Sequence, residues 1–326
     1  MKNIFNSCDK EFSLDENEDI NYVVDKNEIY SVDYSPSLRY FIYAGNDQKC
    51  TVYDTNTKSV CTVIEGFTDS VIFCRFLNTG NLLVCTIDGN ILITSLDGSI
   101  SHSEDISEEI SCVEVSDESI FIGTYAGTVY KFNYDLSDQT VYMEQGSEIY
   151  KIHHYNGIIY SLSESTLAST DGIRIQLEKA TSFSMIPGTE IFCISTLEDV
   201  LVYKSTTLLN KFSIEGHTET VEYTDGYFII AGYCDYILLI NTKINMCTHK
   251  MCIPSSGINK LKKGGDHKIY FSTMCGYVGV CDIRRDESVH MYETRVEAPF
   301  DIYWDKDTFY VGGLKGIDIL KTEDFN

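Results

Sequence analysis

Short apolar runs separated by turns rich in Gly, Asn and Asp recur along this chain. In the clearest stretch, residues 66–97, the pattern predicts strands over 71–76, 82–86 and 91–94. Runs of β-forming residues bounded by such turns are typical of antiparallel hairpins. A single unit of this kind leaves both faces of its small sheet uncovered, so we expect the chain to repeat it.

The unit does repeat, and its period matches that of propeller blades, which have four strands in about 40 residues. Seven units would leave one clear strand–turn–strand segment unassigned, so the pattern predicts an all-β fold, an eight-bladed β-propeller. Aligned on the first apolar residue of each unit, the predicted starts are Ile29, Val71, Ile110, Ile149, Phe183, Val221, Ile258 and Phe300.

The two ends of the chain predict how the ring closes. The last unit, 300–320, offers only three strands, whereas a lone β-rich run over 20–24 precedes the first complete unit. We expect this N-terminal strand to supply the missing outer strand of the last blade, because closure removes exposed sheet edges. Residues 20–326 are therefore predicted to form a single propeller domain. Residues 1–19 are polar and acidic, and we expect a frayed or weakly docked leader.

Composition supports one closed domain outside membranes. The 326 residues include only 4 Pro and are 43% hydrophobic, with no linker rich in Pro, Gly or Ser. No apolar stretch is long enough for a membrane span, and the N-terminus lacks the apolar core of a signal peptide. The 12 Cys are scattered and form no Cys-x-x-Cys pair. Reduced, buried thiols are expected in a cytoplasmic protein, with the nucleus as a second compartment, and no metal site is predicted.

The charge of the chain is strongly negative, with 49 acidic against 25 basic residues and a formal net charge of −24. Direct contact with nucleic acid or an anionic membrane is disfavoured, because no basic stripe could neutralise phosphates. A cationic partner is favoured, since an acidic surface attracts and retains it. The alternative is that the acidity only keeps the protein soluble.

Several units resemble WD repeats. Tyr53-Asp54 stands where such a blade typically carries Trp-Asp, and the resemblance rests on YAGNDQKCTVYD, GFTDSVIFCRF…DGNILI and GHTETV…AGYCDYILLI in the first, second and sixth units. It implies a WD-repeat-like β-propeller. Roughly the first hundred residues, with their acidic leader and NEIYSVDYSP…AGNDQKCTVYDTNTKSV, are similar to the opening of one eukaryotic family. That family comprises the angio-associated migratory cell protein and its fungal counterpart, the dedicated chaperone of ribosomal protein L-ten (universal L-sixteen).

The family resemblance implies an eight-bladed propeller whose acidic upper face holds the basic N-terminal segment of that ribosomal protein. Propellers bind peptides on the face formed by two sets of turns: the connecting turns into each first strand and the turns between the second and third strands. Carboxylates can pair with Arg and aromatic rings can stack on it. The candidate acidic residues in these turns are Glu28, Asp69, Glu108, Glu109, Glu148, Glu219, Glu297, Asp47, Asp88, Asp199 and Asp235, and the candidate rings are Phe67, Tyr125, Tyr233 and Tyr277.

A structural alternative applies to some of these residues. Asp in a tight turn often caps its own backbone, which favours a structural role for Asp47, Asp88 and Asp235. The single Gly-His pair predicts that His217 braces the sixth blade. The adjacent His153 and His154 are expected to point to opposite faces of a strand, which argues against chelation by the pair.

The one basic cluster in the sequence comprises Lys260, Lys262 and Lys263. We expect it on a solvated strand or loop, with contact to ribosomal RNA as the alternative.

No enzymatic motif occurs in the chain: it lacks the Gly-x-Ser-x-Gly, Gly-x-x-x-x-Gly-Lys-Ser/Thr and His-Glu-x-x-His signatures. We therefore predict a non-enzymatic, monomeric ribosome-assembly chaperone without a cofactor. The alternative is a scaffold subunit of a multi-protein complex in translation initiation or trafficking.

Overall fold

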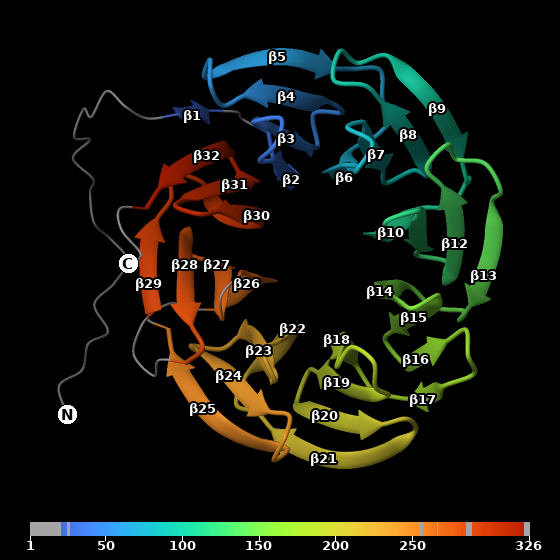
Figure 1. The fold of residues 1–326 in the computed structure, drawn as a ribbon, viewed down its shortest axis with the longest axis vertical. Coiled ribbons are helices and arrows are strands. Elements are labelled where there is room, and N and C mark those ends of the chain that lie inside the picture. Colours follow the sequence, from blue (N-terminus) through green and yellow to red (C-terminus); the bar gives the residue numbers. More distant parts are fainter. Residues whose placement is uncertain (1–20, 25–26, 254–256, 266, 285–288, 323–326) are drawn as a thin grey trace.

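The computed structural model describes residues 21–24, 27–253, 257–265, 267–284 and 289–322. Within these residues the chain is all β, and eight four-stranded antiparallel sheets form a ring around a central channel (Figure 1). This arrangement confirms the predicted eight-bladed propeller. Among the described residues, no helix has the length and apolar character needed to cross a membrane.

Each blade runs from an inner strand at the channel to an outer strand at the rim. The first four blades consist of β2 (Ile29–Ser35), β3 (Tyr40–Gly45), β4 (Cys50–Asp54), β5 (Ser59–Ile64); β6 (Val71–Phe76), β7 (Leu82–Thr86), β8 (Asn90–Thr94), β9 (Ile100–Asp105); β10 (Ile110–Val115), β11 (Ser119–Thr124), β12 (Thr128–Asn133), β13 (Thr140–Glu144); and β14 (Ile149–Tyr155), β15 (Ile158–Ser163), β16 (Thr166–Ser169), β17 (Arg174–Gln176).

The next three blades follow the same order, and the eighth recruits its outer strand from the start of the chain. Their strands are β18 (Ala180–Met185), β19 (Ile191–Thr196), β20 (Asp199–Lys204), β21 (Thr207–Ser213); β22 (His217–Thr224), β23 (Tyr227–Tyr233), β24 (Tyr236–Asn241), β25 (Met246–Cys252); β26 (Ile258–Lys263), β27 (Lys268–Thr273), β28 (Tyr277–Asp282), β29 (Val289–Glu293); and β30 (Glu297–Asp305), β31 (Thr308–Leu314), β32 (Gly316–Lys321), β1 (Asn21–Val24).

The ring closes between its two ends, as predicted. Strand β1 pairs antiparallel with β32, in a register that runs from Asn21 opposite Ile319 to Val24 opposite Gly316. The eighth sheet therefore has the order β1-β32-β31-β30. The predicted leader, residues 1–19, lies outside the described residues.

A β-bulge recurs near the start of every inner strand. In β2 it falls between Ile29 and Ser31, and the equivalent shift occurs in β6, β10, β14 and β26. A bulge bends a strand and increases its twist. Beyond it, alternate side chains of the inner strand are directed toward the channel and into the core.

The bulges correct the predicted alignment of three units. The equivalent shift falls at Ala180 in β18 and at Thr218 in β22, so these blades begin before the predicted starts Phe183 and Val221. In β30 two shifts flank Pro299, which precedes the predicted start Phe300. In β18 and β22 the first residues of the strand are small or polar. The first clearly apolar residue therefore lies a few positions after the true start of the blade.

Neighbouring sheets contact each other face to face, and the core lies between them. The eight buried clusters of apolar side chains correspond one to one to the eight contacts between adjacent blades. At Gly312 in β31 a side chain would have no room, because a Cβ there would lie 2.6 Å from methyl carbons of Ile29 and Val32 in the first blade. The closing contact between the eighth and first blades thus depends on this glycine.

Gly312→Ala is expected to destabilise the fold by about 1–3 kcal/mol, because the added methyl group overpacks the contact between the last and first blades. The free energy of urea unfolding measures the effect. Gly265→Ala is the matched control, since a Cβ there would meet no atom within 4 Å. Equal stability of the two variants would contradict tight packing at the closure.

Candidate partner-binding face

Two sets of turns meet at one end of the channel, which we call the upper face. The turns between second and third strands donate backbone hydrogen bonds to the connecting turns of the same blade. Asn46 N–H donates to the Glu28 carbonyl at 3.0 Å, and Tyr125 N–H donates to the Glu109 carbonyl at 2.9 Å. The lower face carries the turns between first and second strands and between third and fourth strands.

Two of the predicted acidic residues are held by several hydrogen bonds within their own blade. Asp88 accepts from the Thr68 hydroxyl and, at 3.1 Å, from the Asn90 side-chain amide. Glu108 accepts from the Tyr130 hydroxyl at 2.7 Å. Burial raises the pKa of both carboxyl groups, but hydrogen bonds outweigh it and the pKa of each is lowered. Both side chains therefore stabilise the turns.

Three further acidic residues are engaged locally. Glu28 accepts a hydrogen bond from the Tyr30 hydroxyl at 2.7 Å. Asp47 and Asp69 each accept a backbone N–H close in sequence, at 3.2 and 2.6 Å. These contacts are typical of acidic side chains that stabilise turns.

Two other predicted residues are paired with lysine. Asp199 lies 2.7 Å from the Lys211 ammonium, and Glu297 contacts Lys315. Part of their charge is thereby neutralised within the protein, so they offer less to a cationic partner than unpaired carboxylates do.

Four predicted residues remain without a side-chain hydrogen bond or ion pair to any other described residue: Glu109, Glu148, Glu219 and Asp235. Glu148 and Glu219, which belong to different blades, line one cavity on the upper face, with a volume of about 380 Å³. Glu164, Tyr150 and Lys179 line it as well. We call this site the acidic cavity.

The acidic cavity combines segments of four blades, the third to the sixth. Glu148 lies in the connecting turn before β14, Tyr150 at the bulge of that strand, and Glu164 in the turn between β15 and β16. Glu219 comes from the bulge of β22. Neither Glu164 nor Tyr150 was among the residues predicted from the sequence. The recurrent bulge position could have indicated Tyr150, since the corresponding residues Thr181 and Glu219 line the same cavity.

The carboxylates of this cavity form no ion pair: the lysine that lines it, Lys179, lies 3.8 Å from Glu198 instead. Burial raises the pKa of Glu148 and of Glu219. Burial, together with the charges of Glu148 and Glu164, also raises the pKa of Tyr150. A positively charged side chain entering the cavity would relieve this unfavourable accumulation of negative charge.

Two of the predicted aromatic rings are exposed, and one of them lies beside these carboxylates. Tyr125 is 45% exposed, and its pKa is raised by burial and by the nearby Glu148 and Glu109. Tyr233, another of the predicted rings, is also exposed. Phe67 was predicted to be available for stacking, but it is only 9% exposed and packs in the core between the first two blades. That prediction was wrong, because an apolar ring in a connecting turn can turn inward.

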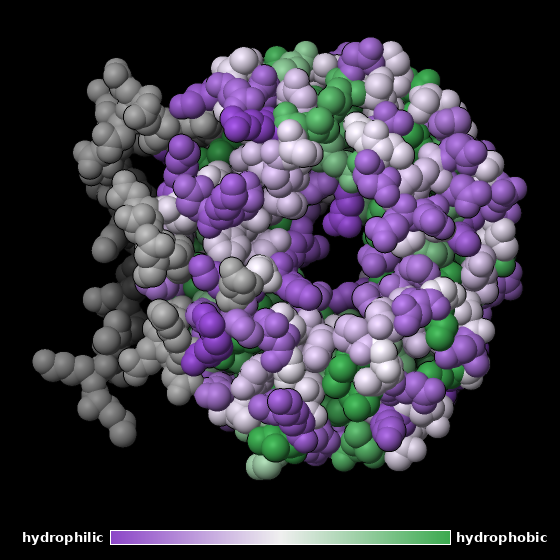
Figure 2. All heavy atoms as spheres, in the orientation of Figure 1, coloured by the Kyte–Doolittle hydropathy of each residue, from purple (hydrophilic) through white to green (hydrophobic). Residues whose placement is uncertain are grey.

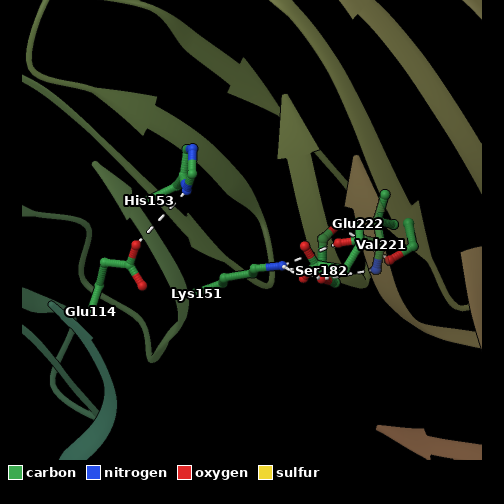
Figure 3. A network of polar contacts seen from close by, with 7 residues as sticks. Glu114, Lys151, His153, Ser182, Val221 and Glu222 are labelled. Carbon is green, nitrogen blue, oxygen red and sulfur yellow. Dashed lines mark hydrogen bonds and ion pairs between the residues drawn. The ribbon is translucent and has the colours of Figure 1, made fainter. Parts of the chain in front are cut away.

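The central channel is lined by hydrophilic side chains (Figure 2). Lys151 crosses from the fourth blade toward the sixth: its ammonium lies 3.1 Å from the Glu222 carboxylate and donates to the Val221 carbonyl at 3.2 Å (Figure 3). On the other side, His153 lies 3.9 Å from Glu114. Burial lowers the pKa of His153.

The basic cluster is also part of the channel. Lys262 lies 2.6 Å from the Asp301 carboxylate and donates to the Ile302 carbonyl at 2.7 Å. Lys260 and Lys262 lie on the inner strand β26, with Leu261 between them in the core. The expected solvated strand or loop is therefore wrong for these two lysines, whereas Lys263 is exposed.

Positive and negative charges balance among the inner-strand side chains that interact across the channel. Because four acidic and four basic side chains make up this set, they add no net charge, and the large negative net charge of the chain resides on the rest of the protein. Among the described residues, the charged side chains beyond the bulges that interact with one another are Asp33, Glu114, Glu222 and Asp301 on one side and Arg75, Lys151, Lys260 and Lys262 on the other.

The three histidines considered in the sequence make contacts within the fold. His217 Nδ1 lies 3.0 Å from the Leu197 carbonyl and so links the sixth blade to the fifth. His154 stacks on Phe121 with ring centroids 5.0 Å apart, whereas its neighbour His153 faces Glu114. Within the described part of the chain, no three or more His, Cys, Asp or Glu residues are grouped so that they could hold a metal ion.

The class of protein follows from this architecture and from one sequence comparison: residues 27–320 match the WD40-like domain family. The chain therefore belongs to the WD40-like family of β-propellers. No curated protein matches the sequence significantly.

Solved structures with the same fold include Sqt1 from two organisms. Saccharomyces cerevisiae Sqt1 is 14% identical with a TM-score of 0.78, covering 92% of this chain and 97% of that one. Chaetomium thermophilum Sqt1, solved bound to the N-terminus of ribosomal protein L10, is 13% identical with a TM-score of 0.78, covering 91% and 97%. A computationally designed protein, Ika8, has a TM-score of 0.80 at 13% identity, covering 91% and 97%.

The side chain of Glu114 generates a prediction about pH. Burial raises its pKa to about 7, although Arg75 and Lys151 lower it. Because the folded pKa exceeds the unfolded one, stability is lost as pH rises from about 4.5 to about 7. Glu114→Gln should therefore be more stable than the unmodified protein at pH 8, by about 1 kcal/mol after allowance for solvent in the channel.

Urea unfolding at pH 5 and pH 8 measures this difference. The control is Glu118→Gln, an exposed glutamate in the turn after β10, which should show no such pH dependence. If the difference in unfolding free energy between Glu114→Gln and the unmodified protein were the same at pH 5 and at pH 8, the Glu114 carboxylate would be well solvated.

Proposed function

We propose that this protein is a non-enzymatic chaperone that binds the basic N-terminal segment of a newly made large-subunit ribosomal protein on its upper face. The observation that carries the proposal is the acidic cavity, where three carboxylates, Glu148, Glu164 and Glu219, gather without an ion pair to any described residue. The fold similarity to Sqt1 bound to the N-terminus of ribosomal protein L10 supports the nature of the segment.

The arrangement of the upper face suits an extended basic peptide. Glu109 and Tyr125 in the third blade are followed by Glu148 and Tyr150 in the fourth, with Glu219 in the sixth. Arg can pair with a carboxylate through two hydrogen bonds and stack on an adjacent tyrosine ring. Carboxylates spaced over neighbouring blades would contact successive basic side chains of one segment.

The negative charge of the protein favours binding of the basic segment before the ribosomal protein is assembled into the ribosome. A net charge of −24 attracts a cationic segment over a distance, and this attraction accelerates association at moderate ionic strength. Masking the positive charge of an unassembled ribosomal protein would limit its non-specific contacts with nucleic acid. The proposed site of action is the cytoplasm, and we infer a monomer because every blade packs against blades of the same chain on both sides.

A second candidate is a scaffold subunit of a multi-protein complex. Exposed apolar side chains on the outer rim favour it. Four such side chains are about half exposed: Leu208 and Leu209 on β21, Ile244 in the turn before β25 and Met246 at the start of β25. Exposed apolar patches often mark contacts with other proteins. Stable co-purification with one large assembly, dependent on these residues, would support the scaffold over the chaperone.

The decisive test is a charge reversal of the acidic cavity. The double variant Glu148→Lys/Glu219→Lys should weaken binding of a basic N-terminal ribosomal-protein peptide by about tenfold or more, because each lost charge-assisted contact is worth about 1.5–3 kcal/mol. Calorimetric titration at low salt measures the dissociation constant.

The matched control is Glu118→Lys/Glu190→Lys, which changes the net charge equally but at exposed turns of the lower face. This control should bind almost as well as the unmodified protein. Equal losses in both variants would mean that only overall charge matters, and unchanged binding in both would contradict the proposed site.

Binding should also depend strongly on ionic strength. Raising salt from about 0.05 to 0.5 M shortens the screening length severalfold, so the dissociation constant should rise by at least about tenfold if several ion pairs form. Titrations at three salt concentrations provide the slope. An affinity insensitive to salt would indicate a mainly apolar interface and would favour the scaffold alternative.

A further inference from the structure

A second and larger cavity lies at the opposite, lower mouth of the channel. Its volume is about 640 Å³, and it is lined by the turns that follow β2 and β6 together with inner-strand side chains. The turns contribute hydroxyl groups, including those of Ser35, Ser37 and Thr79. Small-molecule sites typically measure about 300–1,000 Å³, so a small organic ligand would fit here.

Arg75 is the unusual residue of this cavity. It lies on β6 with its guanidinium over the Phe73 ring, 5.3 Å from the ring centroid. Within the described part of the chain its side chain has no hydrogen bond and no ion pair. The N–H donors of a guanidinium are normally hydrogen-bonded. Those of Arg75 are available to a ligand.

The other charged groups of this cavity are already engaged. Asp33 accepts the backbone N–H of Phe76 at 2.9 Å, and Lys262 is bound to Asp301 at 2.6 Å. Burial raises the pKa of Asp33 and the charge of Arg75 lowers it, but no hydrogen bond or ion pair joins the two side chains, so the guanidinium donors remain open to an incoming anion. In a chain with 49 acidic residues, this mouth therefore presents an arginine that is close to carboxylates but not hydrogen-bonded to them.

One wall of the cavity is aromatic. Tyr34, Tyr270 and Tyr303 line it, and the rings of Tyr34 and Tyr303 meet edge to face with centroids 6.0 Å apart. Tyr34 also stacks on Tyr310 at 4.3 Å, which fixes its orientation. Burial raises the pKa of Tyr303, so its hydroxyl stays protonated and able to donate. The wall can thus hold a flat ring and donate hydrogen bonds.

We propose that the lower mouth of the channel is a binding site for a small organic acid, whose oxyanion pairs with Arg75 and whose flat part contacts the tyrosine wall. A carboxylate or a phosphate would both satisfy this chemistry, because each can accept two hydrogen bonds from one guanidinium. The site is separate from the acidic cavity, and it does not depend on the function proposed above.

The test uses benzoate, phenyl phosphate and inorganic phosphate as probes of the full-length protein. Benzoate or phenyl phosphate should bind with an affinity that Arg75→Gln weakens at least tenfold. Tighter binding of benzoate identifies a carboxylate ligand, and tighter binding of phenyl phosphate identifies a phosphate. Inorganic phosphate should bind more weakly than phenyl phosphate, since it lacks the ring.

Arg174→Gln is the matched control, because Arg174 is an exposed arginine on β17 at the rim, and its loss should leave probe binding unchanged. In the unmodified protein, the Nε resonance of Arg75 should shift on addition of the bound probe, which tests the site even if Arg75→Gln folds poorly. Absence of binding by all three probes would overturn the proposal, as would binding that leaves the Arg75 resonance unmoved.

Discussion

Apolar packing between neighbouring sheets is the interaction on which the rest of this structure depends. Each blade contacts the blade on either side of it, and each of the eight buried clusters draws its side chains from two adjacent blades. No single blade can bury both of its faces alone. The ring is therefore stable only when complete, which explains why the strand that closes it comes from the opposite end of the chain.

Most of the fold could be predicted from the sequence because its signals are local. Alternation of apolar and polar residues, together with glycine-rich turns, indicated the strands and their number. The register at the start of β18 and β22 could not be predicted, since Ala180 and Thr218 are not distinguished from turn residues by hydrophobicity. A bulge follows each of these two residues and is defined by pairing with the next strand. The local pattern of apolar and polar residues does not show this pairing.

The inner strands show how position changes the meaning of charge. Lys260 and Lys262 form a basic cluster in the sequence, yet they face the channel beside Asp301. Lys151 likewise finds Glu222 two blades away. Such pairs join residues far apart in the chain, so composition alone could not reveal them. Their mutual neutralisation leaves the excess of acidic residues to the outer surfaces, where it can act on a partner.

The turn carboxylates show why a binding site was harder to predict than the fold. Bracing a turn and binding a cation both require an acidic side chain at the same kind of position. Asp88 is surrounded by hydroxyl and amide donors of its own blade, so its charge is already used. Glu148 has no such donors, and it remains available beside Tyr150. Because the framework of the upper face is stabilised by residues such as Asp88, the unpaired carboxylates need not contribute to folding and can be directed to a ligand.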